Sequence, residues 1–177
     1  MEPGSPVLRV ALIGARGAGK TTVGRHLSAL LGVPFADLDQ ETSPDEPAGL
    51  LLARVGLAAF RRQELAALLR VLARSGPWVL ATGGGVVETP PARALLAEAA
   101  RCVWLRAPAA VLRARLEADT APRPPLAGAD ALEEIEAVLA LREAQYAALA
   151  EATVDASREP AHVARDAALA LGLIQGR

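Results

Sequence analysis

The stretch VLRVALIGARGAGKTTVGRHLSALLG, residues 7–32, decides the fold of this chain. It opens with a short apolar run that is typical of a buried strand and that ends at Gly14. From Lys20 onward apolar residues recur at helical spacing, as far as Gly32, a residue type that commonly ends helices. The stretch therefore predicts a strand, a glycine-rich turn and a helix in direct succession.

The turn, residues 14–21, reads GARGAGKT and matches the P-loop pattern G-x-x-x-x-G-K-[ST]. Glycines let successive backbone N–H groups converge on a phosphate, and the positive end of the following helix adds to the attraction. Lys20 is the only lysine in a chain with 18 arginines, so this position demands an ammonium group. A turn without a ligand is the alternative, but the strand and helix around it favour a nucleotide site. The residues expected to bind ATP here are Gly14, Ala15, Arg16, Gly17, Ala18, Gly19, Lys20, Thr21 and Thr22, with the Thr21 hydroxyl also on Mg²⁺.

The rest of the chain continues this alternation of strands and helices. We expect further strands at 33–36, 78–81, 102–105 and 153–155, and helices at 50–74 with a break at Gly56, 90–100, 108–118, 131–150 and 160–171. Residues 42–47 are expected to form a loop or a broken helix start, and residues 119–129 a proline-rich loop. This order predicts an α/β domain whose parallel sheet is covered on both faces and binds ligands at the carboxyl ends of its strands.

Composition limits the classes of function. With 177 residues, 52% of them hydrophobic, the chain can form one globular domain with its own core, and residues 1–6 are expected to be disordered. A net charge of −1 argues against nucleic acid or an anionic membrane as partner. The single cysteine, Cys102, excludes a disulfide framework, and no signal peptide or membrane span is recognisable. A cytoplasmic protein is expected.

Polar and small residues follow the expected second and third strands. Asp37 and Asp39 end the second strand, where alternate side chains of an extended segment point to opposite sides, so that one carboxylate can face a metal. Asp37 is the better metal candidate because the third strand carries no acid. That strand ends instead in Gly83, Gly84 and Gly85, which we expect to form the backbone wall of a pocket. Two solvated carboxylates and a flexible turn are the respective alternatives.

Three arginines stand out by position. Arg142 lies on the apolar stripe of the helix at 131–150, where a charge needs a partner from another element or a ligand anion. Arg61 lies on an otherwise apolar helix and can equally form a simple ion pair with Glu64. Arg123, in the proline-rich loop, can stabilise a phosphoryl group during transfer, or belong to a surface loop without function.

Taken in order, these motifs resemble the shikimate kinases, a family of small P-loop kinases. Besides the P-loop, the resemblance rests on DLD at 37–39, FRRQE at 60–64, GGG at 83–85, RPPL at 123–126 and REAQY at 142–146. It implies a three-layer P-loop domain with a five-stranded parallel sheet of order 2-3-1-4-5. It also implies ATP- and Mg²⁺-dependent phosphorylation of shikimate to shikimate 3-phosphate, in the pathway to the aromatic amino acids. A monomer is expected.

The resemblance also implies roles for individual residues. Arg61 and Arg142 would bind the carboxylate of shikimate, Asp39 its reacting hydroxyl, and the Gly83, Gly84 and Gly85 backbone its ring hydroxyls. Thr21 and Asp37 would serve Mg²⁺, and Arg115 and Arg158 would lie near the adenine. Lys20, Asp39 and the lid residue Arg123 would be catalytic. Two alternatives stay open, namely a non-catalytic domain that senses a ligand and another small-molecule kinase, such as a gluconate kinase.

Overall fold

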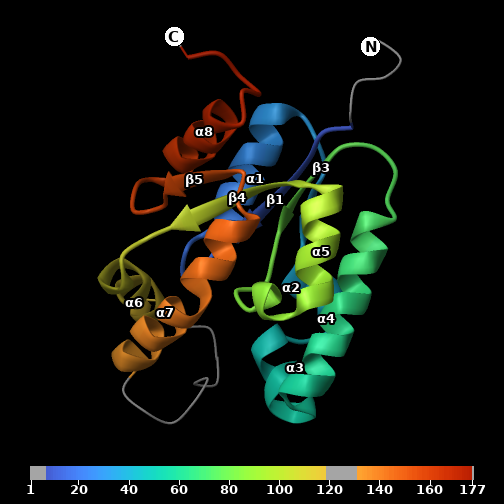
Figure 1. Ribbon diagram of the computed structural model, residues 1–177, viewed down its shortest axis with the longest axis vertical. Helices are drawn as coiled ribbons and strands as arrows, with labels where there is room; N and C mark the ends of the chain where they lie inside the picture. Colours follow the sequence, from blue (N-terminus) through green and yellow to red (C-terminus); the bar gives the residue numbers. More distant parts are fainter. Residues whose placement is uncertain (1–6, 119–130, 177) are drawn as a thin grey trace.

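The five strands of the computed structural model form one parallel sheet (Figure 1). The structure describes residues 7–118 and 131–176, so the expectations for residues 1–6 and for the loop at 119–129, Arg123 included, lie outside it. The strands are β1 (Arg9–Ile13), β2 (Phe35–Asp37), β3 (Trp78–Ala81), β4 (Arg101–Arg106) and β5 (Ala152–Asp155). Their order is β2-β3-β1-β4-β5, which confirms the predicted fold class and strand order.

Helices cover both faces of this sheet (Figure 1). They are α1 (Lys20–Leu31), α2 (Leu38–Thr42), α3 (Ala48–Val55), α4 (Leu57–Leu72), α5 (Pro90–Ala99), α6 (Ala109–Ala118), α7 (Ala131–Leu149) and α8 (Pro160–Ala170), with a 3-10 turn η1 (Val86–Glu88). Side chains of β1 alternate between two apolar clusters, one with α1 and α8 and the other with α4, α5 and α7. None of the described helices is long and apolar enough to cross a membrane.

Most element bounds agree with the sequence pattern, because local signals set them. Helix α1 begins at Lys20, and the left-handed Gly32 ends it at φ 66°. Gly56 separates α3 from α4 as expected. The short helix α2 was not expected, and the prediction of an extended segment through Asp39 was wrong. Strand β2 ends at Asp37, whose side chain caps α2 by accepting a hydrogen bond from the backbone N–H of Asp39.

The parallel register gathers the predicted site residues at one edge of the sheet. Ala81 of β3 lies opposite both Leu12 of β1 and Asp37 of β2. The P-loop, Asp37 and the glycine run that follows β3 therefore leave the sheet side by side. Thr82 fixes this edge, since both its backbone N–H and its hydroxyl donate hydrogen bonds to the carbonyl of Leu12.

Candidate active site

A cavity of about 700 Å³ opens where β1, β2 and β3 end, and most of the predicted site residues line it. Of the predicted site residues that the structure describes, four do not line this cavity, namely Gly14, Ala15, Ala18 and Arg158. Arg158 is exposed and pairs with Asp166. Arg115 of α6 lines the cavity, and its side chain donates to the carbonyl of Gly17 at 3.4 Å. The sheet edge thus brings together motifs that lie far apart in the sequence.

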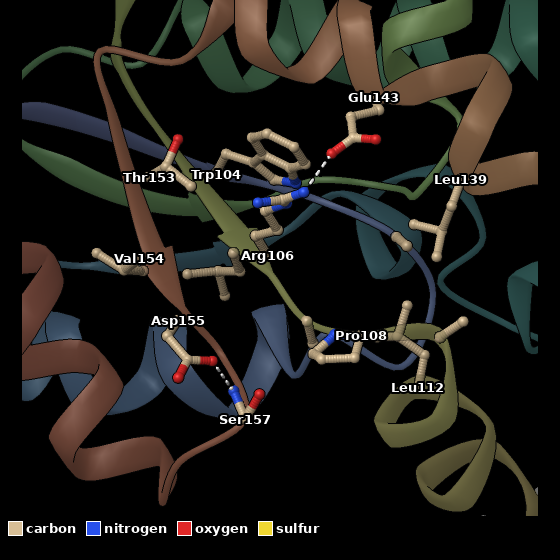
Figure 2. Close-up of a pocket in the computed structure, with 14 residues that line it drawn as sticks. Trp104, Arg106, Pro108, Leu112, Leu139, Glu143, Thr153, Val154, Asp155 and Ser157 are labelled. Atoms are coloured by element: carbon tan, nitrogen blue, oxygen red, sulfur yellow. Dashed lines mark hydrogen bonds and ion pairs between the residues drawn. The ribbon is translucent and has the colours of Figure 1, made fainter. Parts of the chain in front are cut away.

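A second cavity, of about 650 Å³, is lined by residues of β4, α6, α7 and β5 (Figure 2). Arg106 and Glu143 form an ion pair across it at 2.7 Å, and the carboxylate of Asp155 accepts from the backbone N–H of Ser157. Of the predicted site residues in the described part, it contains Ala15 alone. Because its charged groups pair with each other or with backbone, the candidate chemistry lies in the first cavity.

Lys20 lies buried in the P-loop, at the start of α1. Gly19 precedes it at φ 85°, a backbone conformation that favours glycine. The Lys20 ammonium donates to the carbonyls of Gly14 and Ala15, both at 2.8 Å. Burial lowers the pKa of Lys20 to about 8, although Asp39 and Asp37 act in the opposite direction. The ammonium is therefore held at the cavity in a poorly solvated position, where an anionic ligand would stabilise its charge.

Thr21 and Asp37 place two oxygen ligands next to this lysine. The Thr21 hydroxyl donates to the Asp37 carboxylate at 2.6 Å, and both residues line the cavity. No group of three His, Cys, Asp or Glu residues in the described part could hold a metal alone. Mg²⁺ keeps several waters and needs only one or two protein oxygens beside substrate phosphates, so this pair fits Mg²⁺ that arrives with a nucleotide.

Two arginines from different helices also line the cavity and share a partner. Arg61 of α4 forms an ion pair with Glu64 at 2.7 Å and a second one with Glu88 at 2.9 Å. Arg142 of α7 pairs with the same oxygen of Glu88 at 2.8 Å. The simple Arg61–Glu64 pair therefore exists, yet Arg61 also lines the cavity. The partner of Arg142 does come from another element, as its place on the apolar stripe required.

Two acids near these arginines were missed as site residues in the sequence. Glu64 is 2% exposed, and burial raises its pKa, although Arg61 acts in the opposite direction. Its Oε1 has no hydrogen-bond partner within the described residues. The only signal for Glu64 was its spacing from Arg61. Glu88 carried no signal, because its contacts reach residues 27 and 54 positions away.

The three glycines leave room for these charged side chains. A Cβ on Gly83 would lie 2.3 Å from Oε1 of Glu64, and one on Gly85 would lie 1.7 Å from Nη2 of Arg61. None of the three has a positive φ. They are therefore glycine because of space rather than backbone conformation. All three line the cavity, which supports the expected backbone wall.

Comparison with known proteins decides the family. A family model described as shikimate kinase matches residues 16–171. The chain belongs to the shikimate kinase family. A "Shikimate kinase 2" of Yersinia pestis is 42% identical over 159 residues, 87% of this chain and 90% of that protein. Another, of Erwinia tasmaniensis, is 40% identical over 170 residues, 94% of this chain and 97% of that protein.

A solved structure agrees with these relatives. The shikimate kinase of Acinetobacter baumannii, in complex with shikimate, is 30% identical, covers 96% of both chains and gives a TM-score of 0.86. This shikimate kinase family member is thus an enzyme, a transferase that uses ATP, with the activity of its family. Membership of the shikimate kinase family decides against the two alternatives left open by the sequence, a ligand-sensing domain without catalysis and a gluconate kinase.

Proposed function

We propose that the first cavity transfers the γ-phosphoryl group of ATP to a ring hydroxyl of shikimate and so forms shikimate 3-phosphate. One observation carries the assignment of residues. A single cavity is lined both by the P-loop residues Lys20 and Thr21 and by the arginine pair, Arg61 and Arg142. Phosphates suit the P-loop, which we call the nucleotide end, and a carboxylate suits the arginine pair, which we call the acceptor end. The cavity can therefore hold a nucleotide and an organic acid at once.

At the nucleotide end, backbone N–H groups of the P-loop and Lys20 bind the phosphates. By the resemblance, Arg115 and Arg158 would lie on the side of the base. Thr21 and Asp37 would hold Mg²⁺, with Asp37 acting through water as the resemblance implies. When bound, Mg²⁺ supplies positive charge to the phosphate oxygens.

At the acceptor end, the guanidinium groups of Arg61 and Arg142 bind the carboxylate of shikimate. Such planar donors suit a carboxylate better than an ammonium does. The backbone of Gly83, Gly84 and Gly85 accommodates the ring hydroxyls. The cavity is mostly a device for positioning, as expected for phosphoryl transfer.

Asp39 lies near both Lys20 and the glycine wall. Among the carboxylates, Asp39 raises the pKa of Lys20 the most. Its Oδ1 would lie 3.1 Å from a Cβ on Gly83. From this place it can orient the attacking hydroxyl and accept its proton. Lys20 stabilises the transferred phosphoryl group, and the resemblance assigns the same task to Arg123. The proposal includes a monomeric, cytoplasmic enzyme built as one P-loop domain.

Coupled measurement of ADP release tests the function. With ATP and Mg²⁺, we expect rapid release when shikimate is added, and only background release with gluconate or with water as acceptor. Chelation of Mg²⁺ should stop the reaction, and the product should be shikimate 3-phosphate by mass spectrometry. Equal release with gluconate, or release independent of any acceptor, would contradict the proposal.

A further inference from the structure

A third carboxylate, that of Glu88, connects the two arginines. Its Oε2 accepts from Nη2 of Arg61 at 2.9 Å and from Nη2 of Arg142 at 2.8 Å. Glu88 ends η1, the turn that follows the glycine wall directly. One carboxylate oxygen thus joins α4, α7 and the loop after β3. Hydrogen bonds between two charged groups, as here, are the stronger kind.

Glu88 approaches the arginines from outside the cavity. Among the described residues, Arg61 and Arg142 line the cavity and Glu88 does not. The side chain of Glu88 is 38% exposed, whereas those of Arg61 and Arg142 are 18% and 12% exposed. Each terminal guanidinium nitrogen carries two N–H groups, so each arginine keeps donors for a ligand after pairing with Glu88.

The other groups around the pair do not repeat this connection. Glu64 pairs with Arg61, and Arg142 donates from Nη1 to the carbonyl of Gly84 at 3.5 Å and also contacts the Tyr146 hydroxyl. Nε of Arg142 is buried without a partner in the part of the chain that the structure describes. Among the described residues, Glu88 is the carboxylate that forms an ion pair with both guanidinium groups, whereas Glu64 forms one with Arg61 and acts on Arg142 only through its charge.

We propose that Glu88 is a positioning residue that holds Arg61 and Arg142 together as a preformed clamp for a carboxylate. This inference rests on the proposed function, in which these arginines bind the carboxylate of shikimate. A carboxylate that enters the cavity then meets guanidinium groups that are already ordered, and binding spends less free energy on ordering them. Glu88 supports the arginines from behind and does not occupy the place of the substrate.

Steady-state kinetics of Glu88→Ala test this inference. We expect KM for shikimate to rise by ~5-fold, the scale of ordering side chains at the moment of binding. KM for ATP should stay within a factor of about two, because the hydrogen bonds given for Glu88 go to Arg61 and Arg142 and not to the P-loop. The value of kcat should change less than KM for shikimate. Glu88→Gln keeps the shape and one acceptor oxygen, so it should rescue part of the loss.

Glu151→Ala is the matched control. Glu151 also pairs with an arginine, Arg101, but at the amino end of β4, away from the cavity. This variant should leave KM for shikimate unchanged. If Glu88→Ala raises both KM values and lowers the melting temperature, the substitution has damaged the structure in general. Parent-like kinetics of Glu88→Gln would in that case overturn the positioning role.

The remaining outcomes are also decisive. An unchanged KM for shikimate in Glu88→Ala overturns the inference, and a lower KM shows that Glu88 competes with the substrate instead. Arg142→Ala distinguishes a failure of the Glu88 inference from a failure of the proposed function. If it raises KM for shikimate while Glu88→Ala does not, only the role of Glu88 fails. If neither variant changes KM, the arginine assignment of the proposed function fails as well.

Discussion

The hydroxyl of Tyr146 donates a hydrogen bond to the carbonyl oxygen of Gly84, with 2.5 Å between the two oxygens. Tyr146 is fully buried and stacks on Trp104 with 5.7 Å between ring centroids. Burial raises the pKa of Tyr146 to about 12, so its hydroxyl stays protonated at any ordinary pH. Helix α7, which also carries Arg142, therefore holds Gly84, the middle residue of the glycine wall, in place through Tyr146.

Tyr146→Phe removes this one hydrogen bond and keeps the ring. The Gly84 carbonyl would lose its short contact, so we expect the free energy of unfolding to fall by about 1 kcal/mol. Because the same carbonyl faces Arg142, KM for shikimate should rise while KM for ATP stays constant. Urea unfolding and steady-state kinetics measure the two effects. A parallel rise of both KM values would show that the hydroxyl serves the whole fold rather than the wall.

Gly85→Ala places a methyl group where Nη2 of Arg61 lies, 1.7 Å from the new Cβ. Arg61 can move, since its guanidinium is the end of a flexible side chain, but it then leaves Glu64 and Glu88. We expect KM for shikimate to rise by at least ~10-fold, or about 1.4 kcal/mol, with little loss of stability. Gly176→Ala is the control, because its Cβ would meet no atom closer than 3.9 Å. Normal kinetics of Gly85→Ala would disprove the spatial explanation of the glycine wall.

Asp37→Asn changes the proposed magnesium site without changing its shape. The single amide oxygen can keep only one of the two hydrogen bonds that the carboxylate accepts, from the Thr21 hydroxyl or from the backbone N–H of Asp39, and the neutral amide attracts a cation less. We expect the Mg²⁺ concentration for half-maximal rate to rise by roughly 10-fold or more, as is typical for a residue that acts on a metal through water. KM for shikimate should hardly move. Titration of Mg²⁺ at saturating shikimate checks this, and equal effects on both ligands would mean that Asp37 and Asp39 have exchanged roles.

Lys20 should make nucleotide binding depend on pH. Its pKa of about 8 in the free protein means that it is charged below pH 8 and increasingly neutral above it. Phosphates favour the ammonium, so binding must restore the proton at high pH. The Kd for ADP should therefore rise between pH 7 and pH 9, approaching about 10-fold per pH unit above the pKa. Calorimetry of Lys20→Arg is the control, since a guanidinium does not titrate there, and an identical pH dependence in that variant would exclude Lys20 as the cause.

Local signals in the sequence were enough for the architecture. The P-loop, the helix end at Gly32 and the break at Gly56 depend on residues within a few positions of each other, and the structure has them where the pattern indicated. Helix α2 was not predicted because it has only five residues and depends on a cap by Asp37. The apolar run before it suggested a strand instead. Such a short helix has no periodic pattern to detect.

The site was less accessible than the fold. The arginine on the apolar stripe signalled that Arg142 needs a partner, but nothing in the sequence pointed to Glu88, because the two meet only after α7 and η1 pack together. The triple glycine signalled a close approach without naming what approaches. The structure supplies the answer, which is the side chains of Arg61 and Glu64. Contacts between distant elements leave no spacing rule in a sequence.

Arg142, together with Arg61, is proposed to recognise the carboxylate of the acceptor. The most direct test is calorimetric binding of shikimate to Arg142→Ala. We predict that its Kd rises by at least ~10-fold, or about 1.4 kcal/mol, while the Kd for ADP is unchanged. Arg142→Lys should recover only part of the affinity. The exposed Arg165 of α8 provides the control variant, Arg165→Ala, which should bind normally. Normal shikimate binding by Arg142→Ala, together with a lower melting temperature, would contradict the claim and make Arg142 a structural residue.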